Sequence, residues 1–265
     1  MDETKPLRKI GEQHRKAKLV VFDLDGTLTA SKTDMDEEMA GLIKSLLEKK
    51  MVAVISGGKY EQFQKQLLSK LNLGSNLSFF KKLFLFPTSG TSFYRYNGQD
   101  WEQVYAEKLS EEEKKRILES FEKTFQELNY THPEKIYGEI VEDRGTQITF
   151  SALGQDAPVQ EKGDWNKEHN AERLKILEVL QRFLPDLEVR AGGLTSIDVT
   201  RKGIDKEYGI RQIKKHLGID FSEMLFVGDA FFPGGNDLVV LRTDVLCFEV
   251  QGPEDTKQLI RSLLF

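Results

Sequence analysis

Two aspartates placed two residues apart, Asp23 and Asp25, are the residues of this chain best suited to chemistry. They end the segment Leu-Val-Val-Phe-Asp-Leu-Asp-Gly-Thr (residues 19–27), in which four apolar residues precede the first carboxylate. Such an apolar run is typical of a strand buried on both faces of a parallel sheet, and open α/β sheets bind ligands beyond the carboxyl ends of their strands. There, one carboxylate can attack while the other transfers a proton, and a hard cation such as Mg²⁺ can offset their charge. Aspartates that follow a strand can also simply form a turn.

Two later apolar runs also end in small polar residues. Residues 51–55 lead into Ser56-Gly57-Gly58, and residues 224–227 lead into Gly228-Asp229. Helical patterns separate or follow these runs, which gives the β-α-β order of a parallel sheet. If the strands are neighbours, their polar ends converge on one edge of that sheet. The helical patterns cover residues 34–50, 59–71, 205–217 and 254–264.

Polar residues at this edge could transfer a phosphoryl group, which requires a nucleophile, neutralisation of the phosphoryl oxygens and protonation of the leaving oxygen. We expect Asp23 to form an aspartyl phosphate and Asp25 to act as general acid and base. A lysine from the region of Lys202 and Lys206 would offset the phosphate charge, although such a lysine could also be solvated on a helix. Ser56 could alternatively cap a helix. The predicted phosphate-binding residues are Thr27, Ser56, Gly57 and Lys206, and the predicted Mg²⁺ ligands are Asp23, Asp25, Asp229 and Asp237.

The middle of the chain has a different periodicity. Alternating apolar and polar residues around Asn97-Gly98 and Gly192-Gly193 predict two β-hairpins, and Ser110 with Glu113 forms a capping box that begins a helix. We therefore expect an inserted α+β cap domain within a Rossmann-like α/β core. The predicted domains are a first part of the core at residues 1–89, a cap at 90–200 and a second part of the core at 201–265.

Composition limits the class of protein. With 265 residues, 39% of them apolar, the chain can form one large domain or two smaller ones. A net charge of -5 argues against a nucleic-acid binder, and no apolar run is long enough for a membrane helix or a secretory signal. We expect a cytoplasmic protein with a mobile leader at residues 1–16. The lone Cys247 lies in an apolar run and is expected in the core.

Three other classes fit less well. A phosphate-receiving signalling domain would be about half this length and would lack the insertion. A binding protein without catalysis would be expected to have lost Asp23 or Asp25, and both are present. A nucleotide-dependent kinase would be expected to carry a Gly-x-x-x-x-Gly-Lys-Ser/Thr loop, and the sequence has none.

These motifs together resemble the haloacid dehalogenase (HAD) superfamily, and within it most closely the eukaryotic-type phosphomannomutases, which carry a large cap between the second and third motifs. The resemblance extends over nearly all of residues 19–265. It implies that Asp23 is the nucleophile, Asp25 the general acid and base, and Asp229 a magnesium ligand. It also implies that Arg144, Ser196 and Asp198 in the cap hold a sugar phosphate, and that a homodimer could form through the cap. The segments that carry it are Phe22 to Thr27, Gly192-Gly193 with Ser196-Ile197-Asp198, Asp205-Lys206, Gly228-Asp229 with Pro233 to Asp237, and Pro253 to Thr256 with Leu263 to Phe265.

Three departures from that family favour hydrolysis. The stretch from Gln147 to Gln155 contains no arginine where the mutases carry several, Lys32 replaces an arginine, and Ser56 resembles the phosphatases. A mutase must hold the second phosphate of a sugar bisphosphate in its cap, for which bidentate arginines are suited. We therefore predict a magnesium-dependent phosphatase of a phosphorylated sugar, with a mannose 1-phosphate/mannose 6-phosphate mutase as the alternative. Arg144, Arg190 and Lys162 could still rebuild a phosphate site.

Overall fold

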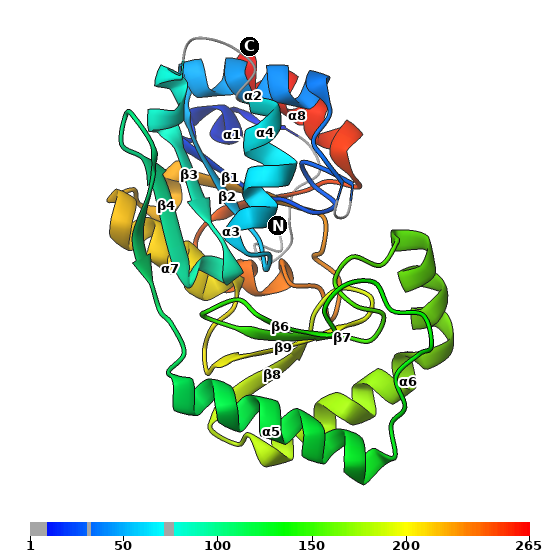
Figure 1. Cartoon of the computed structure of the whole chain (residues 1–265). Coiled ribbons are helices and arrows are strands. Elements are labelled where there is room, and N and C mark those ends of the chain that lie inside the picture. The colour runs from blue at the N-terminus through cyan, green and yellow to red at the C-terminus, as the bar shows by residue number, and fades with distance from the viewer. Residues whose placement is uncertain (1–9, 31–32, 72–76) are drawn as a thin grey trace. The chain divides into compact units, whose positions relative to one another are not determined.

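The computed structural model describes residues 10–30, 33–71 and 77–265 (Figure 1). The chain divides into two compact units. The core unit comprises the chain up to Ala106 together with Asp205–Phe265, and the cap unit comprises Glu107–Ile204. The cap therefore begins later than the predicted residue 90 and ends four residues after the predicted residue 200.

The core unit contains a seven-stranded sheet in the order β11-β10-β1-β2-β3-β4-β5. The strands from β11 to β3 are parallel, whereas β4 and β5 form an antiparallel hairpin that extends the sheet beyond β3. The prediction assigned this hairpin to the cap, and that was wrong, because β4 pairs with β3 of the core. The strands are β1 (Leu19–Asp23), β2 (Met51–Ile55), β3 (Leu83–Phe86), β4 (Ser92–Tyr96), β5 (Trp101–Ala106), β10 (Met224–Gly228) and β11 (Leu246–Glu249).

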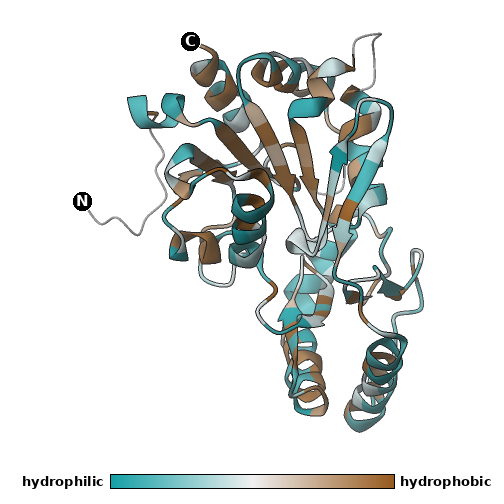
Figure 2. Ribbon diagram, turned by 90° about the vertical axis from the view of Figure 1, so that its left-hand side faces the viewer, coloured by the Kyte–Doolittle hydropathy of each residue, from teal (hydrophilic) through white to brown (hydrophobic). Residues whose placement is uncertain are grey.

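Helices cover both faces of this sheet, as the buried parallel strands require. All five residues of β1 are buried, and alternate residues face opposite layers: Val20 belongs to one apolar cluster and Val21 to the other. The parallel strands of the core sheet are strongly apolar, while the helices carry polar outer faces (Figure 2). The helices α2 (Glu37–Lys49) and α8 (Pro253–Leu264) contribute to the first cluster and α7 (Lys206–Leu217) to the second. The core is thus a three-layer α/β sandwich, as predicted.

The segment after β2 is not one continuous α-helix, as its periodicity suggested. It consists of α3 (Tyr60–Phe63), the π-helical segment η1 (Gln64–Leu68) and α4 (Ser69–Leu71). Part of the expected mobile leader is also ordered, because α1 (Glu12–Lys16) forms a short helix with His14 fully buried. Lys32 and residues 1–9 of the leader lie outside the described residues. The 3-10 helices are η2 (Ser78–Lys82), η3 (Thr88–Gly90), η4 (Phe221–Glu223) and η5 (Leu238–Arg242).

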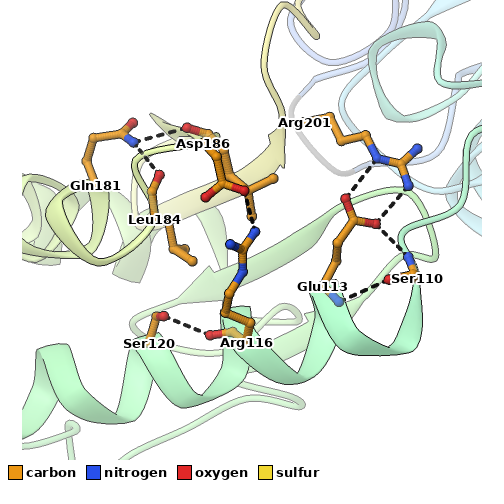
Figure 3. A network of polar contacts seen from close by, with 9 residues as sticks. Ser110, Glu113, Arg116, Ser120, Gln181, Leu184, Asp186 and Arg201 are labelled. Carbon is orange, nitrogen blue, oxygen red and sulfur yellow. Dashed lines mark hydrogen bonds and ion pairs between the residues drawn. The ribbon is translucent and has the colours of Figure 1, made fainter.

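The cap unit is an antiparallel four-stranded sheet, in the order β6-β7-β9-β8, with two helices packed on one face. The capping box at Ser110 is confirmed, and the Glu113 carboxylate that completes it also accepts two hydrogen bonds from Arg201 (Figure 3). The sequence did not reveal β6, which is only three residues long, or the first turns of α6. The elements are α5 (Glu111–Leu128), β6 (Val141–Asp143), β7 (Ile148–Ser151), α6 (Val159–Phe183), β8 (Leu187–Ala191) and β9 (Ser196–Arg201).

Across the described residues, none of the helices combines the length and the apolar character needed to cross a membrane.

Candidate active site

The polar ends of three parallel strands meet at one edge of the core sheet. β1 lies between β10 and β2, and Asp23 is directly opposite Ile55, the residue before Ser56. On the other side Phe22 pairs with Val227, so that Asp229 follows at the same edge. The predicted convergence of these strand ends is confirmed.

Lys206 connects two of the predicted aspartates. Its Nζ donates a hydrogen bond to Asp23 Oδ1 at 2.5 Å and another to Asp237 Oδ1. The three side chains are almost completely buried, with Lys206 only 2% exposed. Lys202, the alternative considered from the sequence, is exposed and belongs to the cap unit. Lys206 is therefore the lysine that the fold brings to the nucleophile candidate.

Two glycines allow the helix that carries Lys206 to approach the strand ends. Gly90 has φ +84°, and a Cβ there would lie 2.6 Å from the Cα of Gly209 on α7. A Cβ on Gly209 would in turn lie 2.8 Å from the carbonyl oxygen of Ser89. Because the Ser89 amide donates to the carbonyl of Ser56 at 2.9 Å, this close packing fixes Lys206 and Ser56 together.

Asp237 has a supporting role in this geometry. While one of its oxygens accepts from Lys206, Oδ2 accepts from the backbone amide of Ala230 at 2.8 Å. A Cβ on Gly228 would lie 2.4 Å from the same Oδ2, so this glycine leaves room for the carboxylate. The carboxylate therefore holds Lys206 and the loop after β10 together. Its role as a direct Mg²⁺ ligand stays a prediction.

Asp229 lies against the turn that follows β1. Thr27 Oγ1 donates to Asp229 Oδ1 at 3.2 Å, so the hydroxyl predicted to bind phosphate contacts a carboxylate here. Gly26 has φ +87°, and a Cβ at this position would lie 2.4 Å from Asp229 Oδ2. Glycine is thus required both by the backbone conformation and by the close approach of the carboxylate.

Asp25 points to a different set of partners. Its Oδ2 accepts from Gln62 Nε2 at 2.7 Å and its Oδ1 from Gln66 Nε2 at 3.3 Å. The sequence analysis missed both glutamines, because nothing in the local sequence marks them. Ser56 does not cap a helix, since the N-cap of α3 is Lys59. Instead, the Oγ of Ser56 accepts a hydrogen bond from the Gly58 amide at 3.2 Å.

The charges at this edge are unbalanced. The pKa of Asp23 is raised to about 8: burial is the largest cause, the nearby Asp237 and Asp229 act in the same direction, and Lys206 acts in the opposite direction. Burial and the charge of Asp237 likewise raise the pKa of Asp229. Burial alone would lower the pKa of Lys206, but Asp23 and Asp237 raise it overall, so the ammonium stays protonated. Three carboxylates in this cluster thus face one ammonium.

This excess of negative charge fits a hard cation. Mg²⁺ needs few protein carboxylates and completes its octahedron with water and substrate oxygens. Within the part of the chain that the structure describes, no group of three or more His, Cys, Asp and Glu side chains is placed to hold a metal ion. Asp23 and Asp229, whose charges interact across the cluster, are the pair that fits such a cation. Both side-chain oxygens of Asp25 accept hydrogen bonds from glutamine amides, and its role as a Mg²⁺ ligand stays a prediction.

The cap residues predicted to bind a sugar phosphate lie on or next to the polar face of the cap sheet. Ser196 and Asp198 alternate along β9 with Ile197 and Val199, which belong to the apolar cluster on the other face. One row of paired residues runs across all four strands of the polar face: Glu142, Thr149, Asp198 and Arg190. Within this row Thr149 Oγ1 donates to Asp198 Oδ1 at 2.7 Å.

Arg144 joins the same face through two side chains. Its Nε donates to Glu142 Oε2 at 2.7 Å and its Nη2 to Gln155 Oε1 at 3.1 Å. Lys162 Nζ donates to the carbonyl of Gln155 at 2.9 Å. The cations proposed to rebuild a phosphate site are therefore engaged with protein acceptors, as is Arg190, which pairs with Glu188.

Comparison with known proteins agrees with this architecture. A family model described as "Eukaryotic phosphomannomutase" matches residues 39–265. The chain belongs to the eukaryotic phosphomannomutase family. It is similar to a phosphomannomutase of Saccharomyces cerevisiae (29% identity, covering 92% of this chain and 93% of the yeast protein) and to human phosphomannomutase 1 (26% identity, covering 93% and 92%).

Solved structures place this phosphomannomutase-family chain in the HAD fold. An IMP-nucleotidase of Plasmodium falciparum matches with a TM-score of 0.67 and 19% identity, covering 95% of this chain and 69% of the neighbour. A trehalose-6-phosphate phosphatase of Aspergillus fumigatus matches with a TM-score of 0.54 and 18% identity, covering 96% and 95%. Together with its membership of the phosphomannomutase family, this fold makes the chain a HAD-type enzyme that transfers or hydrolyses phosphate. The comparisons support the mutase alternative better than the phosphatase favoured from the sequence.

Proposed function

We propose that this chain is a phosphosugar mutase that interconverts mannose 1-phosphate and mannose 6-phosphate through an aspartyl phosphate on Asp23. The observation that supports it most is family membership over residues 39–265, combined with a buried Asp23 held by Lys206 at the edge of the core sheet. Mg²⁺ held by Asp23 and Asp229 would neutralise phosphoryl oxygens as the charge redistributes. The cytoplasmic location and cap-mediated homodimer are further parts of this proposal.

The residues of this chain divide the reaction between them. Asp23 Oδ attacks phosphorus while the bond from phosphorus to the sugar oxygen breaks, and Asp25 gives its proton to that oxygen. Lys206 Nζ orients Asp23 through the 2.5 Å hydrogen bond and reduces repulsion between the carboxylate and the incoming phosphate. In the second half of the reaction, a sugar hydroxyl attacks the aspartyl phosphate and returns a proton to Asp25.

In the cap, Arg144, Ser196 and Asp198 would hold the sugar phosphate. Ser56 and Gly57 at the end of β2, with Thr27 after β1, would supply hydroxyl and amide groups to the phosphoryl oxygens. No nucleic acid or membrane takes part in this function.

Hydrolysis is the second candidate, and one observation favours it. The cap arginines of the polar face already have carboxylate partners, Arg144 with Glu142 and Arg190 with Glu188. A second phosphate in the cap would have to displace these partners, whereas a hydrolase has no second phosphate to hold. In that case water, activated by Asp25, would attack the aspartyl phosphate in place of the sugar hydroxyl.

One assay separates the two candidates. The full chain is incubated with Mg²⁺, mannose 1-phosphate and a sugar bisphosphate activator, and the products are followed by phosphorus NMR. We expect mannose 6-phosphate to form faster than inorganic phosphate. Faster release of inorganic phosphate would instead identify a phosphatase, and a panel of sugar phosphates would then define its substrate.

A further inference from the structure

We propose that Gln62 and Gln66 form an amide clamp that positions Asp25 for proton transfer to and from the substrate oxygen. The proposal rests on the function proposed above for Asp25 and adds two positioning residues to it. Both glutamines come from the segment after β2, whereas Asp25 follows β1.

The clamp contacts both oxygens of one carboxylate. Gln62 Nε2 reaches Asp25 Oδ2 at 2.7 Å and Gln66 Nε2 reaches Asp25 Oδ1 at 3.3 Å. The same Nε2 of Gln66 donates to the carbonyl of Thr33 at 3.0 Å, and the side chain is only 2% exposed. Donors on both oxygens limit rotation about both torsions of the short aspartate side chain. Asp25 is therefore held in one orientation before any substrate arrives.

Gln62 and Gln66 are four residues apart, and side chains at that spacing lie on the same face of a helix. The π-helical segment Gln64–Leu68 includes Gln66 and begins two residues after Gln62, so the helix changes its winding between the two glutamines. Such π segments occur frequently at functional sites.

Gly58 provides the space that Gln62 needs. A Cβ at this position would lie 1.9 Å from Gln62 Oε1, so the glutamine side chain folds back over the glycine on its way to Asp25. The amide of the same glycine donates to Ser56 Oγ at 3.2 Å. The turn after β2 therefore supports both the phosphate-site serine and the clamp.

Neutral amides suit a group that must both give and take a proton. Lys206 contacts Asp23 as an ion pair, in which a cation lies directly beside the carboxyl group. An amide donates a hydrogen bond without a formal charge, so the clamp fixes the position of Asp25 and adds no cation beside it. When the leaving oxygen takes the proton of Asp25, the carboxylate formed can accept from both amides.

A leaving-group comparison tests this role. Gln62→Met and Gln66→Met remove the amides at nearly constant length and volume. Phosphorylation of Asp23 is measured in a single turnover, as sugar released from a sugar phosphate and as nitrophenolate released from p-nitrophenyl phosphate. Nitrophenolate needs no proton to leave, so that reaction does not depend on Asp25. For the double variant we expect a loss on the order of 10- to 100-fold with the sugar phosphate and less than about threefold with p-nitrophenyl phosphate.

The chain offers a matched control in Gln64→Met, because Gln64 is exposed on the same π-helical segment. We expect this variant to behave as the wild type with both substrates. Gln62 is only partly buried, so Gln62→Met avoids a change in the core. If this variant lost the same amount of activity with both substrates, the clamp alone would be overturned. A wild-type chain that forms the aspartyl phosphate from neither substrate would overturn the proposed function and the clamp with it.

Discussion

The core unit and the cap unit differ in how their buried charges are balanced. In the core unit, the carboxylates of Asp23 and Asp237 share the ammonium of Lys206, and Asp229 adds a third negative charge nearby. In the cap unit, Arg144 and Glu142 form a one-to-one pair whose side chains are only 10% and 9% exposed. The core site thus carries surplus negative charge, while the cap face is close to neutral by itself.

This difference matches the proposed division of labour, in which the core unit carries out the phosphoryl transfer and the cap unit selects the substrate. A cluster of carboxylates without enough cations is unfavourable in the free protein, but it is ready to receive a metal ion and a phosphoryl group. A neutral face of paired charges is favourable in the free protein, and a ligand binds it only by exchanging partners. Neutralising the core carboxylate Asp23 should therefore lower activity with little loss of stability, whereas removing a charge that is paired, in either unit, should lower stability.

The largest effect is expected from Asp23→Asn. Loss of the nucleophile should lower kcat by at least about 10³-fold. The raised pKa of Asp23, about 8 compared with 3.8 when unfolded, means that the folded state binds more protons, so its contribution to stability declines as pH rises through about 8. The neutral amide avoids that loss, and we expect a Tm at pH 8 equal to or above that of the wild type. Differential scanning calorimetry in the absence of Mg²⁺ measures it.

As a control, the Tm values of Asp23→Asn and of the wild type are also measured near pH 4. The stability advantage of the amide should shrink there. Robust turnover by Asp23→Asn would contradict the nucleophile assignment. A clearly lower Tm at pH 8 would contradict the proposal that the core site stores unfavourable charge.

The next effect concerns Lys206, which stabilises the same cluster. Lys206→Met leaves Asp23 and Asp237 buried without their cation, and breaking such a buried pair typically lowers the free energy of unfolding by about 3–5 kcal/mol. Chemical denaturation with urea gives this value. In the double variant Lys206→Met with Asp237→Asn, one of the two stranded charges is removed, so part of the lost stability should return. No recovery would mean that the two residues do not act as a pair.

The sequence predicted the polar edge of the core sheet well, because the patterns that mark this edge are local in the sequence. An apolar run that ends in Asp23, in Ser56 or in Asp229 identifies a buried strand and its polar end within a few residues. Parallel neighbours then bring those ends together, and the structure confirms it. Lys206 could be inferred from the family resemblance, although only the fold shows that it rather than Lys202 contacts Asp23.

Features that depend on long-range pairing were not predictable. Alternation in residues 93–105 predicted an antiparallel hairpin but not which sheet it joins, and it joins the core. The glutamines Gln62 and Gln66 look like ordinary polar helix residues until the fold places Asp25 beside them. The preference for hydrolysis rested on a few local departures, namely the missing arginines in one short stretch, Lys32 and Ser56, whereas similarity across most of the chain supports the mutase.

The smallest effect is expected in the cap unit, from Glu113→Gln. Hydrogen bonds from Arg201 and from the Ser110 amide lower the pKa of Glu113 to about 2 from 4.5 (Figure 3). The charged carboxylate therefore stabilises the fold above pH 4.5, and this contribution is lost as pH falls from about 4.5 to about 2. Because Arg201 is 43% exposed, solvent screening limits the loss in Glu113→Gln at pH 7 to about 1 kcal/mol.

Fluorescence can assign this loss to the cap, because the two tryptophans lie in different units, Trp101 on β5 and Trp165 on α6. In a Trp101→Phe background, urea unfolding followed through Trp165 should show Glu113→Gln less stable than its parent at pH 7 and nearly equal to it at pH 2.5. A difference that stays constant with pH would mean that the glutamate acts through packing or capping geometry. The charge pairs of the cap would then contribute little to its stability, and the contrast with the core unit would rest on the core charges alone.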